Sequence, residues 1–569
     1  MKNKIIPIAL SREELRERKR RGPKGRRAGA QALVEVRELL GDAPRRRDLL
    51  IEHLHRIQDR YGRLSSDHLA ALAEEMRMAT SEVYEVATFY HHFDIVKEGE
   101  ADPAPLTVRV CDGLSCEMAG AQQLLKQLPA ILGREVRVLH APCIGRCEQA
   151  PAAVVGQNPV PNATVEKIAR TVGAQETKHE PENYIGLDEY RVQGGYSLLR
   201  DCVGGLRSVD SVIAIMESSG LRGLGGAGFP AGRKWKIVRA EPAPRLMAVN
   251  IDEGEPGTFK DRYYLERDPH RFLEGMLIAA WAVGIAAIYI YLRDEYHGCR
   301  TLLERELAKL QAQPPVPGMP AIELRRGAGA YICGEESAMI ESIEGKRGMP
   351  RLRPPYVAQV GLFGRPTLEH NFETLFWVRD LVERGPEWFS SEGRNERKGL
   401  RSFSVSGRVK NPGVKLAPAG ITIRQLIDEF CGGMQDGHEF YGYLPGGASG
   451  GILPASLGDI PLDFDTLQPY GCFIGSAAIV VLSHHDTAQD AARNLMRFFR
   501  DESCGQCTPC RSGTAKALAL IEKPQWNQPL LAELSRVMRD ASICGLGQAA
   551  PNPVDCVVKY FPHELGDTQ

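Results

Sequence analysis

The chain has 569 residues, of which 43% are hydrophobic and 25% charged, and its formal net charge is −1. This length exceeds what one hydrophobic core supports, so several domains are expected, and the balanced charge excludes a general attraction to nucleic acid or membranes. Eight of the 14 cysteines fall into two groups, which indicates metal binding in a reducing compartment rather than a disulfide framework. We therefore expect a cytoplasmic metalloprotein.

The first hundred residues combine a basic start with helical periodicity. Arg16–Arg27 is rich in arginine and lysine and is not followed by an apolar segment, so it does not resemble a secretory signal. We expect residues 1–30 to be a basic tail, either solvated or docked on an acidic face of a partner. Residues 31–100 are predicted to form a helical bundle, because apolar residues recur there at three- and four-residue spacing, as in Leu49–Ile57.

The next segment, 101–175, alternates between strand and helix patterns. Leu106–Cys111 and Val136–Leu139 alternate like strands, and Ala119–Leu132 is typical of a helix. Four cysteines stand at the ends of these elements, in two loops of two: Cys111, Cys116, Cys143 and Cys147. Two thiolates for each iron suit a 2Fe–2S cluster. Zinc, or thiols without a joint role, are the alternatives, although the gaps are wider than in the usual zinc knuckle.

A polar stretch, 176–195, is predicted to be a linker to a larger α/β region over 196–400. The longest apolar run of the chain, Met276–Leu292, lies in this region and approaches the length that spans a bilayer. Gly284 divides it into a helical and a strand-like part, so we expect a buried helix and strand instead of a membrane span.

The first ligand-binding signal of the α/β region is the glycine-dense run Gly220–Trp235. Its glycines allow the backbone to approach a ligand and to turn N–H groups toward phosphate, and Lys234 adds a positive charge. The run contains Gly-x-Gly-x-x-Gly at Gly223, Gly225 and Gly228. Glycine-dense loops produce this pattern by chance, so a dinucleotide-binding turn and a plain flexible loop both remain open.

Two carboxylate-rich loops follow. Asp252, Glu253 and Glu255 come directly after the predicted strand Leu246–Asn250, where α/β proteins bind ligands, and their oxygens accept hydrogen bonds from ribose hydroxyls, carboxamides or flavin N–H groups. A solvated acidic turn is the alternative. The run 327–337 again combines glycines, paired carboxylates and a tyrosine, and its lone Cys333 is expected to be a buried core residue.

The last two segments differ in pattern. Residues 401–485 are β-rich with one short helix, which predicts a small separate module, and residues 486–569 are helical. The helical segment carries Cys504, Cys507 and Cys510, with Cys544 further along. A triplet spaced by two residues plus one distant cysteine is typical of a 4Fe–4S cluster. A four-cysteine zinc site is the alternative, but such sites usually present separated pairs.

The two glycine loops, the Asn250–Gly257 stretch and the cysteine triplet follow one another in the order seen in one family. Residues from about 190 to 569 resemble the flavin-carrying, NADH-oxidising subunit of respiratory complex I, and residues from about 30 to 170 resemble its neighbouring 2Fe–2S subunit. The resemblance implies an α/β multidomain fold: a helical bundle, a thioredoxin-like 2Fe–2S domain, a Rossmann-like FMN/NAD domain, a β-grasp-like module and a C-terminal helical bundle with the 4Fe–4S cluster.

The same resemblance implies FMN, one 2Fe–2S cluster and one 4Fe–4S cluster as cofactors, with NAD(H) bound over the flavin. The residues it places around FMN are Gly223, Gly225, Gly226, Gly228, Lys234, Asn250, Asp252, Tyr331, Gly334, Glu335, Asn371 and Thr374. Those it places around NAD(H) are Phe229, Glu253, Glu255, Glu336 and Tyr356, with Glu253 as the catalytic residue. Two residues depart from the family: Leu224 replaces a common arginine, and His370 replaces an asparagine common in complex I.

The fusion of both units in one chain is similar to the β subunit of NAD-dependent formate dehydrogenases that contain molybdenum or tungsten, and the runs Thr88–Asp102 and Leu444–Ala455 are close to that subunit. The implied partner is a formate-oxidising α subunit with a Mo/W-pterin centre and further iron–sulfur clusters. Electrons would pass reversibly from it through clusters and FMN to NAD⁺. The diaphorase subunit of an NAD-reducing hydrogenase is the nearest alternative, and a zinc-stabilised, non-catalytic assembly scaffold is the alternative of another class.

Overall fold

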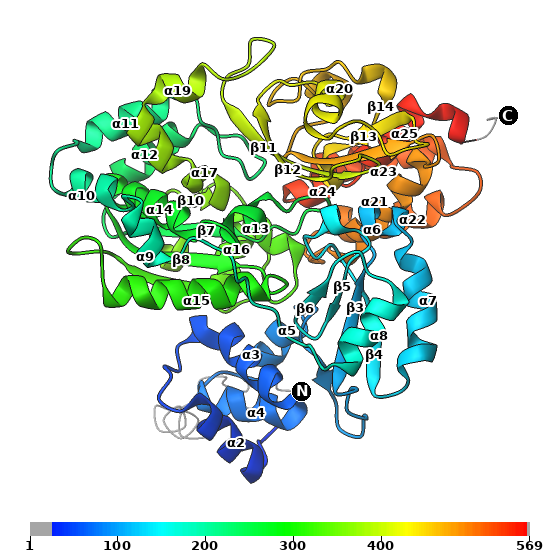
Figure 1. The fold of residues 1–569 in the computed structure, drawn as a ribbon. Coiled ribbons are helices and arrows are strands. Elements are labelled where there is room, and N and C mark those ends of the chain that lie inside the picture. Colours follow the sequence, from blue (N-terminus) through cyan, green and yellow to red (C-terminus); the bar gives the residue numbers. More distant parts are fainter. Residues whose placement is uncertain (1–25, 566–569) are drawn as a thin grey trace, which may run out of the picture. The chain divides into compact units, whose positions relative to one another are not determined.

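The structure is a computed structural model that describes residues 26–565 (Figure 1). Most of the predicted basic tail, 1–30, lies outside the described residues. The chain divides into two compact units, the first formed by the described residues up to 103 with 344–347 and the second by 104–343 with 348–565.

The first unit is a helical bundle, as predicted. Leu54, Ile57 and Leu69 are buried in it, and the Ser65 hydroxyl caps one helix by accepting a hydrogen bond from the N–H of His68 at 3.1 Å. The helices and strands of this unit are α2 (Ala30–Leu40), η1 (Arg47–Leu49), α3 (Leu50–Tyr61), β1 (Leu64–Ser65), α4 (Ser66–Glu75), α5 (Thr80–Ala87) and β2 (Ile95–Val96).

The second unit begins with the thioredoxin-like domain, whose four-stranded sheet has the order β4-β3-β5-β6. β3 and β4 are parallel, and β5 and β6 add antiparallel strands. Its elements are β3 (Leu106–Cys111), α6 (Leu114–Met118), α7 (Ala121–Leu132), β4 (Val136–Ala141), η2 (Cys147–Gln149), β5 (Ala153–Val155), β6 (Asn158–Val160) and α8 (Val165–Gly173). This sheet explains the strand and helix patterns of the sequence.

The predicted linker, 176–195, is corrected by the structure. Its second half contains helix α9 (Leu187–Val192), in which Leu187 and Tyr190 are buried in the core of the following domain. The polar composition of the stretch concealed this helix, because only two of its side chains face the core. The irregular connection is therefore shorter than the predicted one.

The FMN/NAD domain is built on a parallel four-stranded sheet of order β10-β7-β8-β9. Its strands are β7 (Arg245–Ile251), β8 (Ile285–Leu292), β9 (Ala321–Arg326) and β10 (Thr367–Asn371). Its helices are α10 (Ser197–Val203), α11 (Val209–Ser218), α12 (Ala231–Ala240), α13 (Lys260–Leu265), α14 (Pro269–Val283), α15 (His297–Ala312), η3 (Tyr331–Gly334), α16 (Glu336–Ile343), η4 (Leu362–Gly364), α17 (Phe372–Phe376), α18 (Val378–Arg384) and α19 (Pro386–Ser390). The strand order reverses between β7 and β10, which is where open α/β sheets bind ligands.

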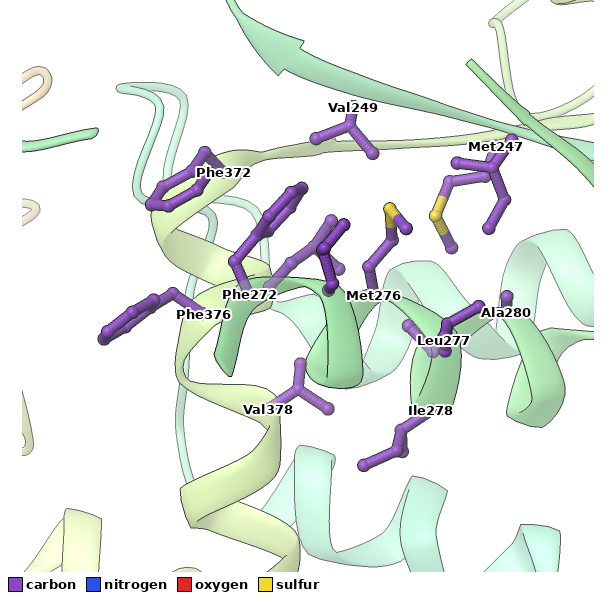
Figure 2. Close-up of a cluster of buried hydrophobic side chains, with 14 of the residues drawn as sticks. Met247, Val249, Phe272, Met276, Leu277, Ile278, Ala280, Phe372, Phe376 and Val378 are labelled. Atoms are coloured by element: carbon purple, nitrogen blue, oxygen red, sulfur yellow. The ribbon is translucent and has the colours of Figure 1, made fainter. Parts of the chain in front are cut away.

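The longest apolar run forms the centre of this domain. Figure 2 shows Phe272 and Met276 of α14 among side chains of β7 and of helices α17 and α18, including Val249 and Phe372. Gly284 ends α14 in the left-handed conformation, and β8 follows at once. No helix within the described residues is long and apolar enough to cross a bilayer, in agreement with the predicted helix and strand.

The remaining two segments are a β module and a helical bundle. The module has a five-stranded sheet of order β12-β11-β15-β13-β14. Its elements are β11 (Leu400–Gly407), β12 (Gly413–Pro418), α20 (Ile423–Gln425), η5 (Leu426–Phe430), β13 (Phe440–Leu444), η6 (Ala448–Gly450), β14 (Leu453–Pro454), η7 (Ala455–Leu457), η8 (Gln468–Tyr470) and β15 (Ala478–Ser483). The bundle comprises α21 (Ala488–Asp501), α22 (Thr508–Ile521), α23 (Gln528–Ala541), α24 (Gly545–Ala549), α25 (Asn552–Tyr560) and η9 (Pro562–Glu564).

Candidate functional site

The candidate site lies at the carboxyl ends of β7 and β10. Asn250 and Asn371 are register partners near the carboxyl ends of these two strands, so the loops that follow them start side by side. The Asn250 amide donates to the carbonyl of Gly334 at 2.9 Å, and its oxygen accepts from the N–H of Asp252 at 3.0 Å. Three of the predicted flavin residues are thereby joined directly.

The glycine loop between α11 and α12 contacts the residues at the carboxyl end of β10. The N–H of Leu224 donates to the Thr374 hydroxyl at 2.9 Å, so the departure at Leu224 leaves this backbone contact in place. A Cβ on Gly225 would lie 3.0 Å from the Cβ of Asn371, and Gly226 has a φ of +121°. A side chain at either position would push the loop away from β10 or strain it, so glycine is needed for this close approach.

Lys234 and His370 belong to the two elements that adjoin this loop, helix α12 and strand β10. The Lys234 ammonium donates to the carbonyl of Glu369 at 3.1 Å, and the Trp235 indole donates to Nε2 of His370 at 2.8 Å. Burial holds the pKa of His370 well below its ordinary value, and the Lys234 charge adds to that effect. His370 is therefore a neutral core residue, and its Nε2 is occupied by the hydrogen bond from Trp235.

Asp252 supplies the test of whether the site suits a flavin. Its Oδ2 is buried without a hydrogen-bond partner among the described residues, and burial raises the pKa of Asp252 well above its usual range. A buried carboxyl oxygen without a hydrogen-bond partner costs about 1–3 kcal/mol, so it calls for an external polar group. The polar edge of a flavin ring beside the glycine cradle carries both N–H and carbonyl groups and would meet this requirement with Asp252 in either protonation state, so the residues present fit FMN.

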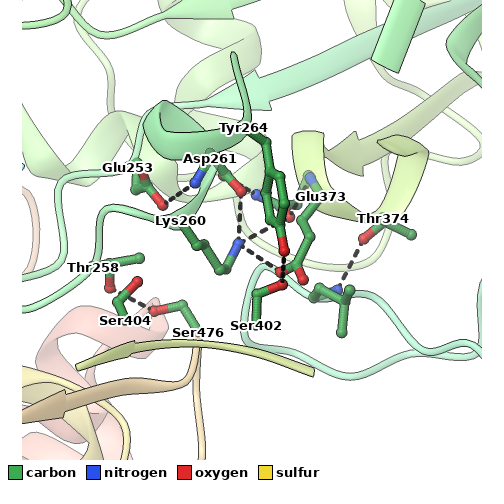
Figure 3. A network of polar contacts seen from close by, with 12 residues as sticks. Glu253, Thr258, Lys260, Asp261, Tyr264, Glu373, Thr374, Ser402, Ser404 and Ser476 are labelled. Atoms are coloured by element: carbon green, nitrogen blue, oxygen red, sulfur yellow. Dashed lines mark hydrogen bonds and ion pairs between the residues drawn. The ribbon is translucent and has the colours of Figure 1, made fainter. Parts of the chain in front are cut away.

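A buried charge network supports the two strand-end loops (Figure 3). The Lys260 ammonium lies 2.7 Å from an oxygen of Asp261 and 3.1 Å from one of Glu373. The Asn371 amide donates to Asp261 at 2.6 Å, and its oxygen caps α17 by accepting from the N–H of Glu373. Burial opposes the charge of Lys260, but its carboxylate neighbours outweigh that effect and raise the pKa of Lys260. The side-chain oxygen and the amide nitrogen of Asn371 are thus both used inside the protein.

Glu253, the predicted catalytic residue, is buried and faces the protein interior. Its carboxylate accepts from the N–H groups of Asp261 and Arg262 at 2.8 and 3.1 Å and from the Tyr296 hydroxyl at 2.9 Å. It therefore caps the first turn of α13. Burial, helped by the nearby Asp261 charge, raises the pKa of Glu253 to about 7. These contacts favour a positioning role for Glu253, and its catalytic role stays a prediction.

The other predicted nucleotide residues differ in their surroundings. Glu255 accepts hydrogen bonds from the Tyr331 hydroxyl and from the N–H of Ser449, the latter at 2.7 Å. Phe229 and Tyr356 keep 38% and 56% of their surface exposed, which suits rings that stack on a ligand. The structure thus brings Glu255 and Tyr331 together, whereas it leaves the two aromatic rings open to solvent.

Glu335 and Glu336 are joined by an arginine that the sequence reasoning did not select. Arg353 forms ion pairs with both carboxylates, at 2.8 Å to Glu336. Glu335 also accepts from the N–H groups of Ser337 and Ala338 at the start of α16, where the helix dipole favours a negative charge.

The first cysteine set converges at one end of the thioredoxin-like sheet. The sulfurs of Cys143 and Cys147 are 3.3 Å apart, and Cys111 and Cys143 both lie within 4 Å of the position that a Cβ on Gly113 would take. Cys111 and Cys116 are buried in the same apolar cluster. All four are buried. Phe259 packs against Cys143 and Cys147, so the loop that carries Glu253 and Glu255 also covers this set.

The second cysteine set lies at the start of α22 and before α24. Cys510 is buried, while Cys504, Cys507 and Cys544 are partly exposed. Within the described residues, no three or more His, Cys, Asp or Glu side chains are close enough together to hold one metal ion between them. The Glu502 carboxylate, two residues before Cys504, accepts from the N–H of Tyr331 at 2.9 Å. This hydrogen bond ties the second set to the candidate flavin site.

Several site residues escaped the sequence reasoning. Glu369 is buried inside β10, where its carboxylate accepts from the Asn250 amide at 3.3 Å. A carboxylate within a buried strand is unusual, so this residue could have been predicted as a site residue. Arg293 donates to the carbonyls of Glu253 and Cys143 at 2.5 and 2.7 Å. Arg293 had no local signal, because it reaches the site only through the fold.

Four family models match the chain. They are the Nuo51 FMN-binding domain over residues 216–380, the thioredoxin-like [2Fe–2S] ferredoxin over 36–175, the SLBB domain over 402–453 and the NADH-ubiquinone oxidoreductase-F iron–sulfur binding region over 490–568. The matches confirm FMN, a 2Fe–2S cluster and a 4Fe–4S cluster as cofactors, with NAD(H) as the substrate. The β module 401–485 is accordingly called the SLBB module below.

Relatives and solved structures agree with these matches. The mitochondrial NADH dehydrogenase [ubiquinone] flavoprotein 1 of Dictyostelium discoideum is 40% identical over 63% of this chain and 78% of its own length. The mitochondrial NADH-ubiquinone oxidoreductase 51 kDa subunit of Aspergillus niger is 38% identical over 65% of this chain and 79% of its own length. Structures of an NAD⁺-reducing [NiFe]-hydrogenase, H₂-reduced and air-oxidised, match 92% of this chain and 92% and 94% of theirs, at 31% identity and TM-scores of 0.79 and 0.80. The chain belongs to the family of NADH dehydrogenase flavoprotein subunits and carries, in the same polypeptide, a thioredoxin-like [2Fe–2S] ferredoxin domain.

Proposed function

We propose that this chain is the diaphorase subunit of an NAD-dependent formate dehydrogenase, partnered by an α subunit that oxidises formate at a Mo/W-pterin centre. The observation that carries the diaphorase role is the joining of the candidate flavin loops to both cysteine sets, through Phe259 on one side and Glu502 on the other. The formate-oxidising partner is supported by the runs Thr88–Asp102 and Leu444–Ala455, which resemble the β subunit of that enzyme. The free thiols support a cytoplasmic location.

FMN and the iron–sulfur clusters, when bound, supply hydride exchange with the nicotinamide and single-electron transfer. The chain's own residues position these groups. The glycine cradle at Gly225 and Gly226 admits a close backbone approach, and the unpartnered oxygen of Asp252 would hydrogen-bond to the polar edge of the flavin ring. The cysteines at 504, 507, 510 and 544 would hold the cube, and those at 111, 116, 143 and 147 the two-iron cluster.

Glu255 and Glu336 are proposed to contact the nucleotide itself. Both are carboxylates at the same strand-end edge, and carboxylate oxygens accept hydrogen bonds from ribose hydroxyls. Their negative charge opposes the additional phosphate of NADP, so we expect NAD to be preferred.

A hydrogenase partner is the second candidate. It is favoured by the match of nearly the whole chain to the NAD⁺-reducing [NiFe]-hydrogenase structures, which covers the ferredoxin and flavin parts together. Both candidates use this chain in the same way and differ only in the subunit that supplies electrons.

Purification of the native complex separates the candidates. We expect formate to reduce NAD⁺ and H₂ to leave it unchanged. Reduction by H₂ alone would replace the formate assignment by the hydrogenase one. A colourless, zinc-containing preparation without NADH:dye activity would reject both and support the scaffold alternative.

A further inference from the structure

Loops of the SLBB module contact the loops that carry the candidate flavin and nucleotide residues. The Arg222 guanidinium, at the start of the glycine loop, pairs with Asp465 at 2.6 Å. The hydroxyls of Thr258 and Ser476 are hydrogen-bonded at 2.8 Å, and Figure 3 shows this pair beside the buried charge network. The module is therefore more than a spacer before the C-terminal bundle.

The most specific of these contacts is made to Glu255. The N–H of Ser449, in η6 of the SLBB module, donates to one oxygen of Glu255 at 2.7 Å, and the Tyr331 hydroxyl donates to the other. The two hydroxyls, of Tyr331 and Ser449, lie 3.4 Å apart. The carboxylate is thus held between two domains, with one donor from each.

The backbone beside Ser449 is shaped to admit this carboxylate. Gly447 has a φ of +70°, and a Cβ there would lie 2.7 Å from Cγ and 3.0 Å from Oε1 of Glu255. The N–H of Gly447 donates to the carbonyl of Ala478 at 2.8 Å, and the carbonyl of Ser449 accepts from the Asn552 amide at 3.0 Å. The loop is consequently fixed to strand β15 on one side and to helix α25 on the other.

We propose that the loop Gly446–Gly451 forms a wall of the NAD(H) site, in which Ser449 is a positioning residue that holds the Glu255 side chain oriented toward the nucleotide. Burial raises the pKa of Glu255, and the hydrogen bonds from Tyr331 and Ser449 oppose that rise while they fix the positions of its two oxygens. This inference rests on the proposed function, because it assigns Glu255 to nucleotide binding, and it gives the SLBB module a role in substrate affinity.

Gly447→Ala tests the proposal, with Gly437→Ala as the matched control. Gly437 lies in the same module and has a φ of +80°, but no atom lies within 4 Å of the added Cβ. Both variants carry the same kind of backbone strain, and only Gly447→Ala collides with Glu255. In NADH:dye assays we expect KM for NADH to rise at least tenfold in Gly447→Ala and to stay within twofold in Gly437→Ala. FMN content and kcat should match the wild type in both.

A double-mutant comparison distinguishes an effect of Gly447→Ala that acts through Glu255 from a general disruption of the fold. In a Glu255→Gln background, Gly447→Ala should raise KM by less than twofold, because the oriented carboxylate is already absent. Should Gly447→Ala fail to fold, Asn552→Ala, which releases the Ser449 carbonyl, is expected to raise KM about threefold, scaled as the loss of one modest hydrogen bond, with FMN retained.

The outcomes separate this inference from the proposed function. If Gly447→Ala, or its substitute Asn552→Ala, shows the KM of the control, or if Gly447→Ala acts equally in both backgrounds, the role of the loop is overturned while the diaphorase activity stands. If the wild-type protein with FMN does not oxidise NADH, the proposed function itself fails.

Discussion

The two cysteine sets differ in how the protein encloses them. Cys111, Cys116, Cys143 and Cys147 are all buried, whereas three of the four C-terminal cysteines, Cys504, Cys507 and Cys544, are partly exposed. The first set lies within a small sheet domain and is covered by Phe259 of the FMN domain. A partly exposed set is the one that a cluster of a partner subunit can approach, so we expect electrons to enter at the C-terminal set.

The buried set is instead linked to the carboxylate loop. Arg293 donates to the carbonyl of Cys143 and to that of Glu253, and a Cβ on Gly145 would collide with the Tyr296 ring at 2.2 Å from its oxygen. Substitutions near the first set should therefore alter the binding of NADH, and substitutions at the second set should alter the transfer of electrons from the partner. Four substitutions test this division.

Cys507→Ser should abolish transfer from the partner to NAD⁺. A serine oxygen is a poor ligand for an iron that prefers thiolate, so the 4Fe–4S signal should disappear and partner-driven NAD⁺ reduction should fall at least 100-fold. NADH:dye activity and the 2Fe–2S signal should persist. Electron paramagnetic resonance and iron content measure these effects. Cys431→Ser, at a buried cysteine outside both sets, is the control that should retain both signals.

Lys260→Met should strongly destabilise the loop that covers the buried set. It leaves Asp261 and Glu373 without their buried cation, and breaking such a pair costs about 3–5 kcal/mol. Chemical denaturation of the FMN-loaded protein measures this loss. Lys126→Met, at an exposed lysine, should change stability by less than about 0.5 kcal/mol. Equal stabilities of the two variants would contradict the importance of the Lys260 network.

Glu253→Gln should change how stability depends on pH. Because the pKa of Glu253 is raised to about 7, the folded state binds a proton that the unfolded state releases above its ordinary pKa. The stability that this bound proton gives the folded state is fully present below the ordinary pKa and is lost as the pH rises to about 7. Between pH 5 and 7 the wild type should lose on the order of 2 kcal/mol relative to the variant. Parallel unfolding curves over this range would contradict the raised pKa.

Arg293→Lys should produce the smallest effect and the one most specific to the buried set. Lysine keeps the charge but cannot bridge two carbonyls as the guanidinium does, so we expect a loss of about 1–2 kcal/mol, as for one or two hydrogen bonds. The 2Fe–2S midpoint potential and KM for NADH should both shift, while the 4Fe–4S potential stays unchanged. A shift confined to the 4Fe–4S cluster would reverse the assignment of the two sets.

Much of the fold and part of the site could be predicted from the sequence. Strand patterns predicted β3, β7 and β8, and the glycine loop and the Asn250–Gly257 stretch were predicted as candidate ligand-facing loops before their positions were known. The linker was predicted too long, because α9 buries only two of its residues. The interior contacts of Glu253 were not predicted, since a carboxylate that follows a strand has the same local pattern whether it faces a ligand or caps a helix.

The sequence by itself determined the features whose residues are close together along the chain: the cysteine triplet, the paired thiolates, the glycine cradle and the carboxylates at a strand end. These features depend on residues that are close along the chain, so local geometry already limits what they can bind. Only the tertiary structure decided which groups meet across domains. Ser449 reaches Glu255, Arg293 joins Cys143 to Glu253, and Glu502 reaches Tyr331, because separate domains fold against one another and no local pattern records such distant partners.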